Sequence, residues 1–341
     1  MPHKTMEKLM PVLKHSSRRR ACIVLMAAAL ATFTALAGAQ NFPTRPITVV
    51  VPIAAGGSTD VITRLVTKHM SESLGQPIVV ENITGAGGII GATKVARAPA
   101  DGYMLVAGSA GSQASAYSVY EKIPYTADSF AQIGLTAMIP ALIVVNKSIP
   151  ANNLKEVVAY IKANPGKVSF GNVGIGTAGH LQCEFFKYVT GTDIAMVPYR
   201  GAAPMISDLM AGQIQGACDA MPSSSSAVQS GHIRAIAVLS ADRVSAMPDV
   251  PTVVEQGMPQ LQSSSWVGLS APKGTPPAVL AALQKALSAA LDDPAIQASI
   301  AKLGAYVPPA KQRGLKYTDD FVHSEVVNWG KLAKAANLVK Q

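Results

Sequence analysis

Glycine-rich segments beside serine and threonine are the parts of this chain best suited to binding a small anion. Glycine lets backbone N–H groups approach a ligand closely, and a hydroxyl at a helix start adds a further donor. An ordinary turn with a helix N-cap is the alternative interpretation. The segment 54–60, AAGGSTD, supplies the first candidate ligand-binding residues, which are Ala55, Gly56, Gly57, Ser58, Thr59 and Asp60.

Two further glycine loops extend this pattern. The loop 84–88, TGAGG, contains the candidates Gly87 and Gly88, but it lacks the G-x-G-x-x-G order of a dinucleotide site. We therefore expect no cofactor. The loop 171–179, GNVGIGTAG, contributes the candidates Thr177, Ala178 and Gly179, and His180 follows it directly.

Two polar segments that follow short strand-like runs complete the candidate site. Arg200 can hold a carboxylate through parallel N–H donors, and Tyr199 beside it can donate its hydroxyl or stack on a ring. Gly201 comes next. Asp219 can bind an amine or a hydroxyl, or simply cap the helix that follows. A solvated arginine is the plainer interpretation of Arg200.

Ser109 keeps an enzymatic alternative open. Residues 107–111 read AGSAG, close to G-x-S-x-G, and His180 with Asp219 would complete a triad on paper. In hydrolases with that motif the acid precedes the histidine, whereas here the order is Ser, His, Asp. We assign no catalytic residue and keep an exported serine hydrolase as the alternative. Otherwise Ser109 and Ser112 offer hydroxyls that orient a ligand.

Charge and histidine spacing exclude other classes of site. His69, His180, His232 and His323 are isolated, so no metal site is expected. Residues 1–39 hold six of the 29 Lys and Arg residues and one of the 20 Asp and Glu residues, which leaves 23 bases against 19 acids. These bases form no run of the kind that binds nucleic acid.

Alternating strand and helix patterns position the glycine loops. Residues 47–53, ITVVVPI, predict a short buried strand, and apolar residues in 59–74 recur at helical spacing. The same order returns along the chain, which predicts an α/β fold with a parallel sheet covered by helices. We expect segments 141–146 and 264–270 to be hinge strands that cross between two blocks.

The first 39 residues read as a secretory signal peptide. Basic residues end at Arg20, residues 21–36 carry no charge, and small residues precede a cleavage site near Ala39. We therefore expect the mature protein in the periplasm, and either the Sec or the twin-arginine pathway could export it. Cys183 and Cys218 remain after cleavage; an oxidising compartment permits a disulfide, although two separate buried thiols are favoured.

Four segments in order resemble a known family of receptors. They are 45–60, 84–105, 198–214 and 249–261, and together they are similar to the extracytoplasmic solute receptors of the tripartite tricarboxylate transporter family, also called Bug-family proteins. The resemblance extends over residues 42–341.

This resemblance implies a two-lobed type II periplasmic-binding-protein (Venus flytrap) fold with two crossover hinge strands. Residues 42–142 and 268–341 would form lobe 1, and residues 143–267 would form lobe 2. It further implies a non-enzymatic receptor that holds a small carboxylate between the lobes and delivers it to membrane permease subunits. The sequence shows no heptad pattern, so we expect a monomer. Di- or tricarboxylates, amino acids and aromatic carboxylates are the candidate ligands. A periplasmic sensor partner for the same ligand class is the second alternative.

Overall fold

Short strands that end in glycine turns and lead into helices build this chain. The computed structural model describes residues 42–338 and 340, so the signal peptide expected at 1–39 lies outside the described residues. Residues from Arg45 onward form one compact unit. Within it the strands form two connected groups, and the expected two-lobed α/β fold is confirmed.

The first group of strands draws on both ends of the chain. β1 is parallel to β2 and β3, whereas β9 is antiparallel to β3 and β4. The prediction of a parallel sheet is therefore wrong for the crossover strands. β4 carries the chain out of this group and β9 brings it back in the opposite direction, so these two strands are antiparallel to each other. The strand order is β2 (Ile78–Asn82), β1 (Ile47–Val51), β3 (Met104–Ser109), β9 (Ser264–Pro272) and β4 (Phe130–Asn146).

The second group of strands continues from β4. β5 is parallel to both β6 and β7, and β4 is antiparallel to β7 and β8. The order from β4 is β7 (Gly216–Ala220), β5 (Ser169–Asn172) and β6 (Ala195–Pro198), with β8 (Ile233–Val238) pairing separately on β4.

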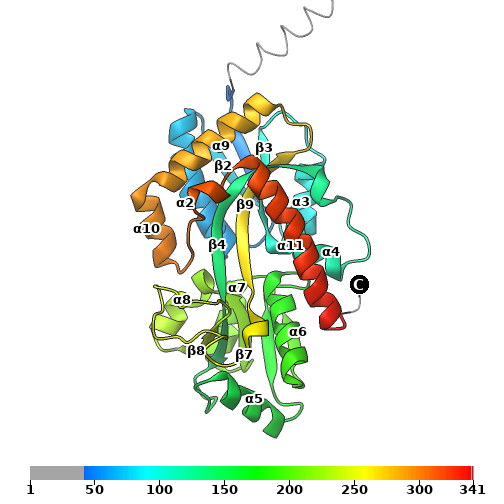
Figure 1. Cartoon of the computed structure of the whole chain (residues 1–341), viewed down its shortest axis with the longest axis vertical. Coiled ribbons are helices and arrows are strands. Elements are labelled where there is room, and N and C mark those ends of the chain that lie inside the picture. Colours follow the sequence, from blue (N-terminus) through cyan, green and yellow to red (C-terminus); the bar gives the residue numbers. More distant parts are fainter. Residues whose placement is uncertain (1–41, 339, 341) are drawn as a thin grey trace, which may run out of the picture. The chain divides into compact units, whose positions relative to one another are not determined.

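β4 connects the two groups because it changes partners along its length. Up to Pro140 it pairs with β9, and from Ala141 it pairs with β7 and β8. Figure 1 shows β4 and β9 side by side between the helices that cover the two groups. The predicted hinge 141–146 is thus the last six residues of the 17-residue strand β4.

Helices cover both groups of strands. α2 packs on β2 and α9, and α11 packs along β4; α6 and α8 pack on β7. The helices are α2 (Ser58–Leu74), α3 (Ile89–Ala96), α4 (Ala116–Val119), α5 (Leu154–Ala163), α6 (Ala178–Thr190), α7 (Ala202–Ala211), α8 (Met221–Gln229), α9 (Pro277–Asp292), α10 (Pro294–Lys302) and α11 (Leu315–Ala335). No helix in the described part of the chain is long and apolar enough to cross a membrane.

Single helical turns and one π-helix complete the elements. The π-helix η2 spans Gly111–Ser115, directly after β3, and the 3₁₀ turns are η1 (Ala86–Gly88), η3 (Ala127–Ser129), η4 (Pro259–Leu261) and η5 (Ala310–Gln312). The π-helix was not predicted from the sequence, and the helix expected after Asp219 is α8, whose bounds were not predicted. In α8 four consecutive serines weaken the helical signal, while Met221 and Ala227 are buried against the second sheet.

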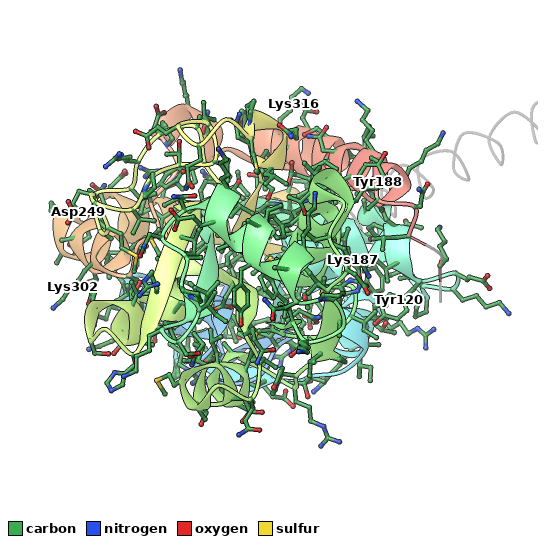
Figure 2. All side chains as sticks on the ribbon, turned by 90° about the horizontal axis from the view of Figure 1, so that it is seen from below. Tyr120, Lys187, Tyr188, Asp249, Lys302 and Lys316 are labelled. Carbon is green, nitrogen blue, oxygen red and sulfur yellow. A yellow bond between two sulfur atoms is a disulfide. The ribbon has the colours of Figure 1, made fainter. Side chains whose placement is uncertain are left out.

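Alternating side chains give the second sheet a core on each face. Ile143 and Val145 pack with Phe170 and Phe186 beneath α6, whereas Leu142 belongs to the core beneath α7 and α8. This follows from the two-residue period of a strand, which sends successive side chains to opposite faces. Charged side chains such as Lys302 and Lys316 lie on the outer surface (Figure 2).

A disulfide joins Cys183 of α6 to Cys218 of β7, whose Cα atoms are 5.5 Å apart. The preference for two separate thiols was therefore wrong. Both cysteines are fully buried in the core where α6 packs on the second sheet. Their separation of 35 residues in the sequence hides this proximity, which only the packing of helix on strand creates.

We expect this disulfide to stabilise the fold by restricting the unfolded chain. A closed loop of 35 residues corresponds to about 4 kcal/mol of unfolding free energy. The double variant Cys183→Ser, Cys218→Ser should therefore melt at least roughly 5 °C below the oxidised protein in differential scanning calorimetry. Equal melting temperatures for the oxidised protein and the double variant would contradict this expectation.

Candidate functional site

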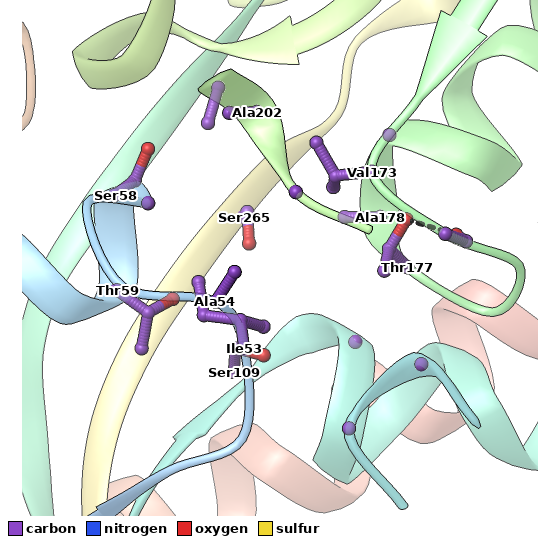
Figure 3. Close-up of a pocket in the computed structure, with 18 of the residues that line it drawn as sticks. Ile53, Ala54, Ser58, Thr59, Ser109, Val173, Thr177, Ala178, Ala202 and Ser265 are labelled. Atoms are coloured by element: carbon purple, nitrogen blue, oxygen red, sulfur yellow. Dashed lines mark hydrogen bonds between the residues drawn. The ribbon is translucent and has the colours of Figure 1, made fainter. Parts of the chain in front are cut away.

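A cavity of about 480 Å³ lies where loops of the two sheets meet. The loops after β1, β2 and β3 line it from one side, and the loops after β5, β6 and β7 line it from the other. Ile139 and Ala141 of β4 and Ser265 of β9 complete the wall. Figure 3 shows Ser58 and Thr59 on one side of this space and Thr177 and Ala178 on the other.

Most of the predicted ligand-binding residues meet at this cavity. The exceptions, which do not line it, are Ala55, Gly56, Asp60, Ser112 and His180. Those that line it are Gly57, Ser58, Thr59, Gly87, Gly88, Ser109, Thr177, Ala178, Gly179, Tyr199, Arg200, Gly201 and Asp219.

The first turn of α2 presents backbone donors to the cavity. Gly57 caps the helix in an extended conformation, with φ −73° and ψ 163°, and no side chain caps it. The amides of Ser58 and Thr59 donate no hydrogen bond within the described part of the chain. Because a helix N-terminus carries partial positive charge, these amides favour an anion.

Asp60 shapes this loop from behind the cavity. Its carboxylate accepts hydrogen bonds from the Gly56 amide at 2.9 Å, from Arg64 Nε at 2.9 Å and from Asn82 Nδ2 at 3.0 Å. Burial alone would raise the pKa of Asp60, but these hydrogen bonds outweigh burial and hold the pKa below its ordinary value. The ionised carboxylate therefore fixes the turn that leads into α2.

The loop before α3 approaches the opposite lobe closely at Gly87. Gly87 has φ +62°, and a Cβ atom there would lie 2.6 Å from the carbonyl oxygen of Ile175. Gly88 follows with φ +100°. Any side chain at position 87 would therefore strain the backbone and collide with the loop after β5.

The first turn of α6 repeats the arrangement seen at α2. Thr177 is the N-cap: its hydroxyl donates to Gly174 O at 2.6 Å and accepts from the His180 amide at 3.4 Å. The amides of Ala178 and Gly179 donate no hydrogen bond within the described chain. A second set of free helix-start donors thus faces the same cavity.

Arg200 is a cation without a partner in the described chain. Arg200 is exposed to solvent and lines the cavity, and its guanidinium makes no hydrogen bond or ion pair with the described residues. The neighbouring Tyr199 hydroxyl instead donates to Asp208 Oδ2 at 2.8 Å. Burial, followed by this hydrogen bond, raises the pKa of Tyr199 to about 12.

Asp219 is the acidic counterpart of Arg200 in the cavity. It is buried at the end of β7 and accepts a hydrogen bond of 2.6 Å from Ser224 of α8. Burial raises its pKa, although hydrogen bonds from Ser224, Ser223 and the Ala220 amide oppose this shift. Arg200 and Asp219 are the charged side chains that line the cavity among the described residues.

The residues of the hydrolase alternative are not linked to one another. Ser109 Oγ accepts from the Ser112 amide at 3.5 Å, and no hydrogen bond within the described chain joins Ser109, His180 and Asp219. The His180 ring is buried, its Nδ1 has no partner, and burial lowers its pKa. The described residues also contain no cluster of three or more side chains that could hold a metal ion.

Hydrogen bonds between the two lobes surround the cavity. Ser58 Oγ lies 3.3 Å from Ser223 Oγ, Tyr120 donates to Ile175 O at 3.0 Å, and Ser115 donates to Gly176 O at 2.7 Å. Each of these contacts joins residues that are more than 50 positions apart in the sequence. They join the two lobes beside the cavity.

Several lining residues were missed by sequence reasoning because they are apolar or lack a motif. Sequence position could have identified Ala202, because it begins the helix after the predicted Gly201. Gln182 lies two residues beyond His180, without a motif of its own. Ala54, Thr84, Gly85, Ala86, Val173, Gly174 and Ile175 lie within the predicted glycine loops without having been named as candidates. The lining residues missed outside those loops are Pro52, Ile53, Gly111, Tyr120, Ile139, Ala141, Gln182, Pro198, Ala202, Ala220, Ser223 and Ser265.

The chain is similar to transporter receptors in sequence and in structure. The family model of the tripartite tricarboxylate transporter family receptor matches residues 62–338. Protein BugT of Bordetella pertussis is 36% identical over 306 residues, which covers 88% of this chain and 92% of BugT.

Two solved structures contain carboxylates. MatC from Rhodopseudomonas palustris, with bound malate, has a TM-score of 0.82 and 35% identity, covering 86% of this chain and all of MatC. An R. palustris protein with adipate has a TM-score of 0.84 and 34% identity, covering 88% of this chain and all of that protein. With the family model, these matches show that the chain belongs to the tripartite tricarboxylate transporter receptor family, the Bug-type extracytoplasmic solute receptors.

Proposed function

We propose that this protein captures a small carboxylate between its two lobes and delivers it to the permease subunits of a tripartite transporter in the periplasm. The observation that carries this proposal is the convergence of free helix-start amides from α2 and α6, together with Arg200, on one cavity. These groups are donors and cations, and they suit an anion with oxygen acceptors.

The size and charge of the cavity support a small organic acid. About 480 Å³ lies within the usual range of small-molecule sites. Because Arg200 is the cationic side chain that lines it, backbone dipoles would supply much of the attraction. The relatives with bound malate and adipate support carboxylates, and tricarboxylates, amino acids and aromatic carboxylates remain within the proposed class.

Closure about two crossovers would convert binding into a signal for the permease. We place the lobe boundaries at 142/143 and 267/268, and the change of partners in β4 at Pro140 and Ala141 supports the first of them. Ligand contacts on both sides of the cavity would favour the closed arrangement. The receptor binds its solute unchanged and acts as a monomer, with no cofactor in this proposal.

Ser58→Pro tests the α2 anion site without disturbing the helix. Proline is tolerated at the first position of a helix, and the extended Gly57 before it suits a following proline. Removing this N–H should weaken carboxylate binding by about tenfold to a hundredfold in isothermal titration calorimetry.

Ser58→Ala is the matched control, because it removes the hydroxyl and keeps the amide. It should bind within about threefold of the unmodified protein, as expected for a neutral hydrogen bond. If Ser58→Pro binds as tightly as Ser58→Ala, the α2 amide does not hold the ligand.

Gly87→Ala tests whether closure depends on the approach of Gly87 to Ile175. Both Gly87 and Gly75 have positive φ, but a Cβ atom at Gly75 would meet nothing within 4 Å. Each alanine variant should lose about 1–2 kcal/mol of unfolding free energy. Only Gly87→Ala should bind ligand about tenfold or more weakly and stay expanded with ligand in small-angle X-ray scattering. Equal binding by the two variants would count against this closure contact.

Asp219 should make carboxylate binding dependent on pH. An anion in the same cavity would raise the already elevated pKa of Asp219 further, so binding would take up a proton. Affinity should then rise as the pH falls toward the raised pKa of Asp219, and Asp219→Asn should abolish this slope. Calorimetry in buffers of different ionisation enthalpy measures the proton uptake. An affinity that instead rises with pH would indicate a cationic group of the ligand at Asp219.

A further inference from the structure

Two consecutive carbonyl groups of the loop after β5 have their hydrogen-bond donors in the other lobe. Ile175 O accepts from the Tyr120 hydroxyl at 3.0 Å. The next carbonyl, Gly176 O, accepts from the Ser115 hydroxyl at 2.7 Å. No backbone N–H of the described residues donates to either carbonyl. Because a buried backbone carbonyl requires a partner, this loop relies on lobe 1 for its hydrogen bonds.

The loop itself is a tight turn held by its own hydrogen bonds. Gly174 has φ +121° and Gly176 has φ +83°, conformations that favour glycine. Thr177 Oγ1 donates to Gly174 O at 2.6 Å, and the Gly174 amide donates to Asn172 Oδ1 at 3.0 Å. The turn therefore keeps its shape and offers Ile175 O and Gly176 O together to lobe 1.

The donor Ser115 belongs to the π-helix η2, which is anchored on its own lobe. Gln113 of η2 is fully buried, and its Nε2 donates to Ser270 Oγ of β9 at 3.2 Å. Ser270 in turn donates to Gln132 Oε1 of β4 at 2.7 Å. These contacts tie η2 to both crossover strands, so the position of the Ser115 hydroxyl is fixed before the loop of lobe 2 meets it.

The Ser115 hydroxyl has a second acceptor that it reaches less well. Gly111 O lies 3.5 Å away, four residues earlier, and this is the carbonyl that a serine uses inside a helix. A hydroxyl donates one proton, and the shorter bond to Gly176 O takes it. When the lobes part, the same proton can turn to Gly111 O. Opening therefore exchanges one hydrogen bond for a weaker one and leaves no buried hydroxyl unpaired.

Apolar packing surrounds the bond between Ser115 and Gly176. Ala114 of η2 and Leu181 of α6 are both fully buried in one cluster, which therefore spans the two lobes. A hydrogen bond in such surroundings is stronger than one in water. Ser115 itself has no exposed surface and does not line the cavity, so a ligand held there does not meet it.

We infer that the Ser115 and Tyr120 hydroxyls form a latch on the loop after β5, and that this latch sets how firmly the closed lobes hold any ligand. The inference rests on the proposed function and deepens it. Both bonds exist only while the lobes are together, so their free energy adds to that of the ligand contacts in the closed arrangement. Ser115 is thus a positioning residue, which acts on closure and leaves the choice of ligand to the cavity.

The test measures the affinities of acids of different shape for variants of the full mature protein. Malate, adipate, glutamate and benzoate are titrated calorimetrically against the unmodified protein and Ser115→Ala. Every acid that binds should bind Ser115→Ala about threefold to tenfold more weakly. The factor should agree among the acids within about twofold, because the lost bond belongs to the protein alone, whereas a residue that touches the ligand changes affinities unequally.

Ser71→Ala is the matched control. The Ser71 hydroxyl donates to Gln76 O at 2.8 Å, and both residues belong to lobe 1, so this variant removes the same kind of bond without affecting closure. All affinities should stay within about twofold of the unmodified protein. Tyr120→Phe removes the second bond of the latch and should weaken every acid by a factor similar to that of Ser115→Ala. It also carries the test if Ser115→Ala does not fold.

Hydrogen exchange of backbone amides reports the latch without reference to ligand contacts. With a saturating concentration of an acid that binds, residues 173–178 should exchange about threefold to tenfold faster in Ser115→Ala than in the unmodified protein. The reason is that this segment separates from lobe 1 whenever the lobes open. Ser71→Ala should match the unmodified protein over the same residues.

The outcomes distinguish this inference from the proposed function. Equal affinities of Ser115→Ala and Ser71→Ala, losses that differ from acid to acid, or unchanged exchange at 173–178 overturn the latch and leave a carboxylate receptor. Failure of every acid to bind the unmodified protein overturns the proposed function itself. A uniform loss of affinity with faster exchange at 173–178 supports both.

Discussion

Free backbone N–H groups at the starts of two helices are the constraint around which this structure is arranged. The first amides of α2 and α6 have no acceptor in the described chain, and both helices begin at the same cavity. Unpaired N–H groups at a helix start carry partial positive charge, and under the proposed function an anion in the cavity would accept their hydrogen bonds. Gly57 and Thr177 end the preceding loops in extended conformations that leave these donors free.

The surrounding structure holds those donors in place. The ionised carboxylate of Asp60 ties the first loop to Arg64 and Asn82, and the disulfide between Cys183 and Cys218 ties α6 to its sheet. Gly87 permits the two lobes to approach within contact distance. Preorganised donors lose little entropy when a ligand binds, and for this reason such supports contribute to affinity without touching the ligand.

The crossover strand β4 explains how one chain brings these parts together. It belongs to both groups of strands and passes the cavity at Ile139 and Ala141, where its partner changes from β9 to β7. Loops after parallel strands open at the same edge of a sheet, and the shared strand sets two such edges facing each other. Under the proposed function, a ligand held there would contact both lobes, and its binding would be coupled to their relative position.

Local patterns in the sequence determined most elements and much of the candidate site. The β-branched run of β1, the glycines after it and the apolar spacing of α2 predicted that strand, turn and helix to within about two residues, because each depends on interactions between near neighbours. The same reasoning found Ser58, Thr177 and Arg200. The tertiary structure alone decided the features that depend on distant partners. The part of β4 before Ala141 depends on pairing with β9, and α8 depends on burial despite its serines. The disulfide between Cys183 and Cys218 and the position of Gln182 at the cavity depend on how α6 packs against β7. Such contacts leave no local periodicity, since the free energy that fixes them comes from residues far away in the chain.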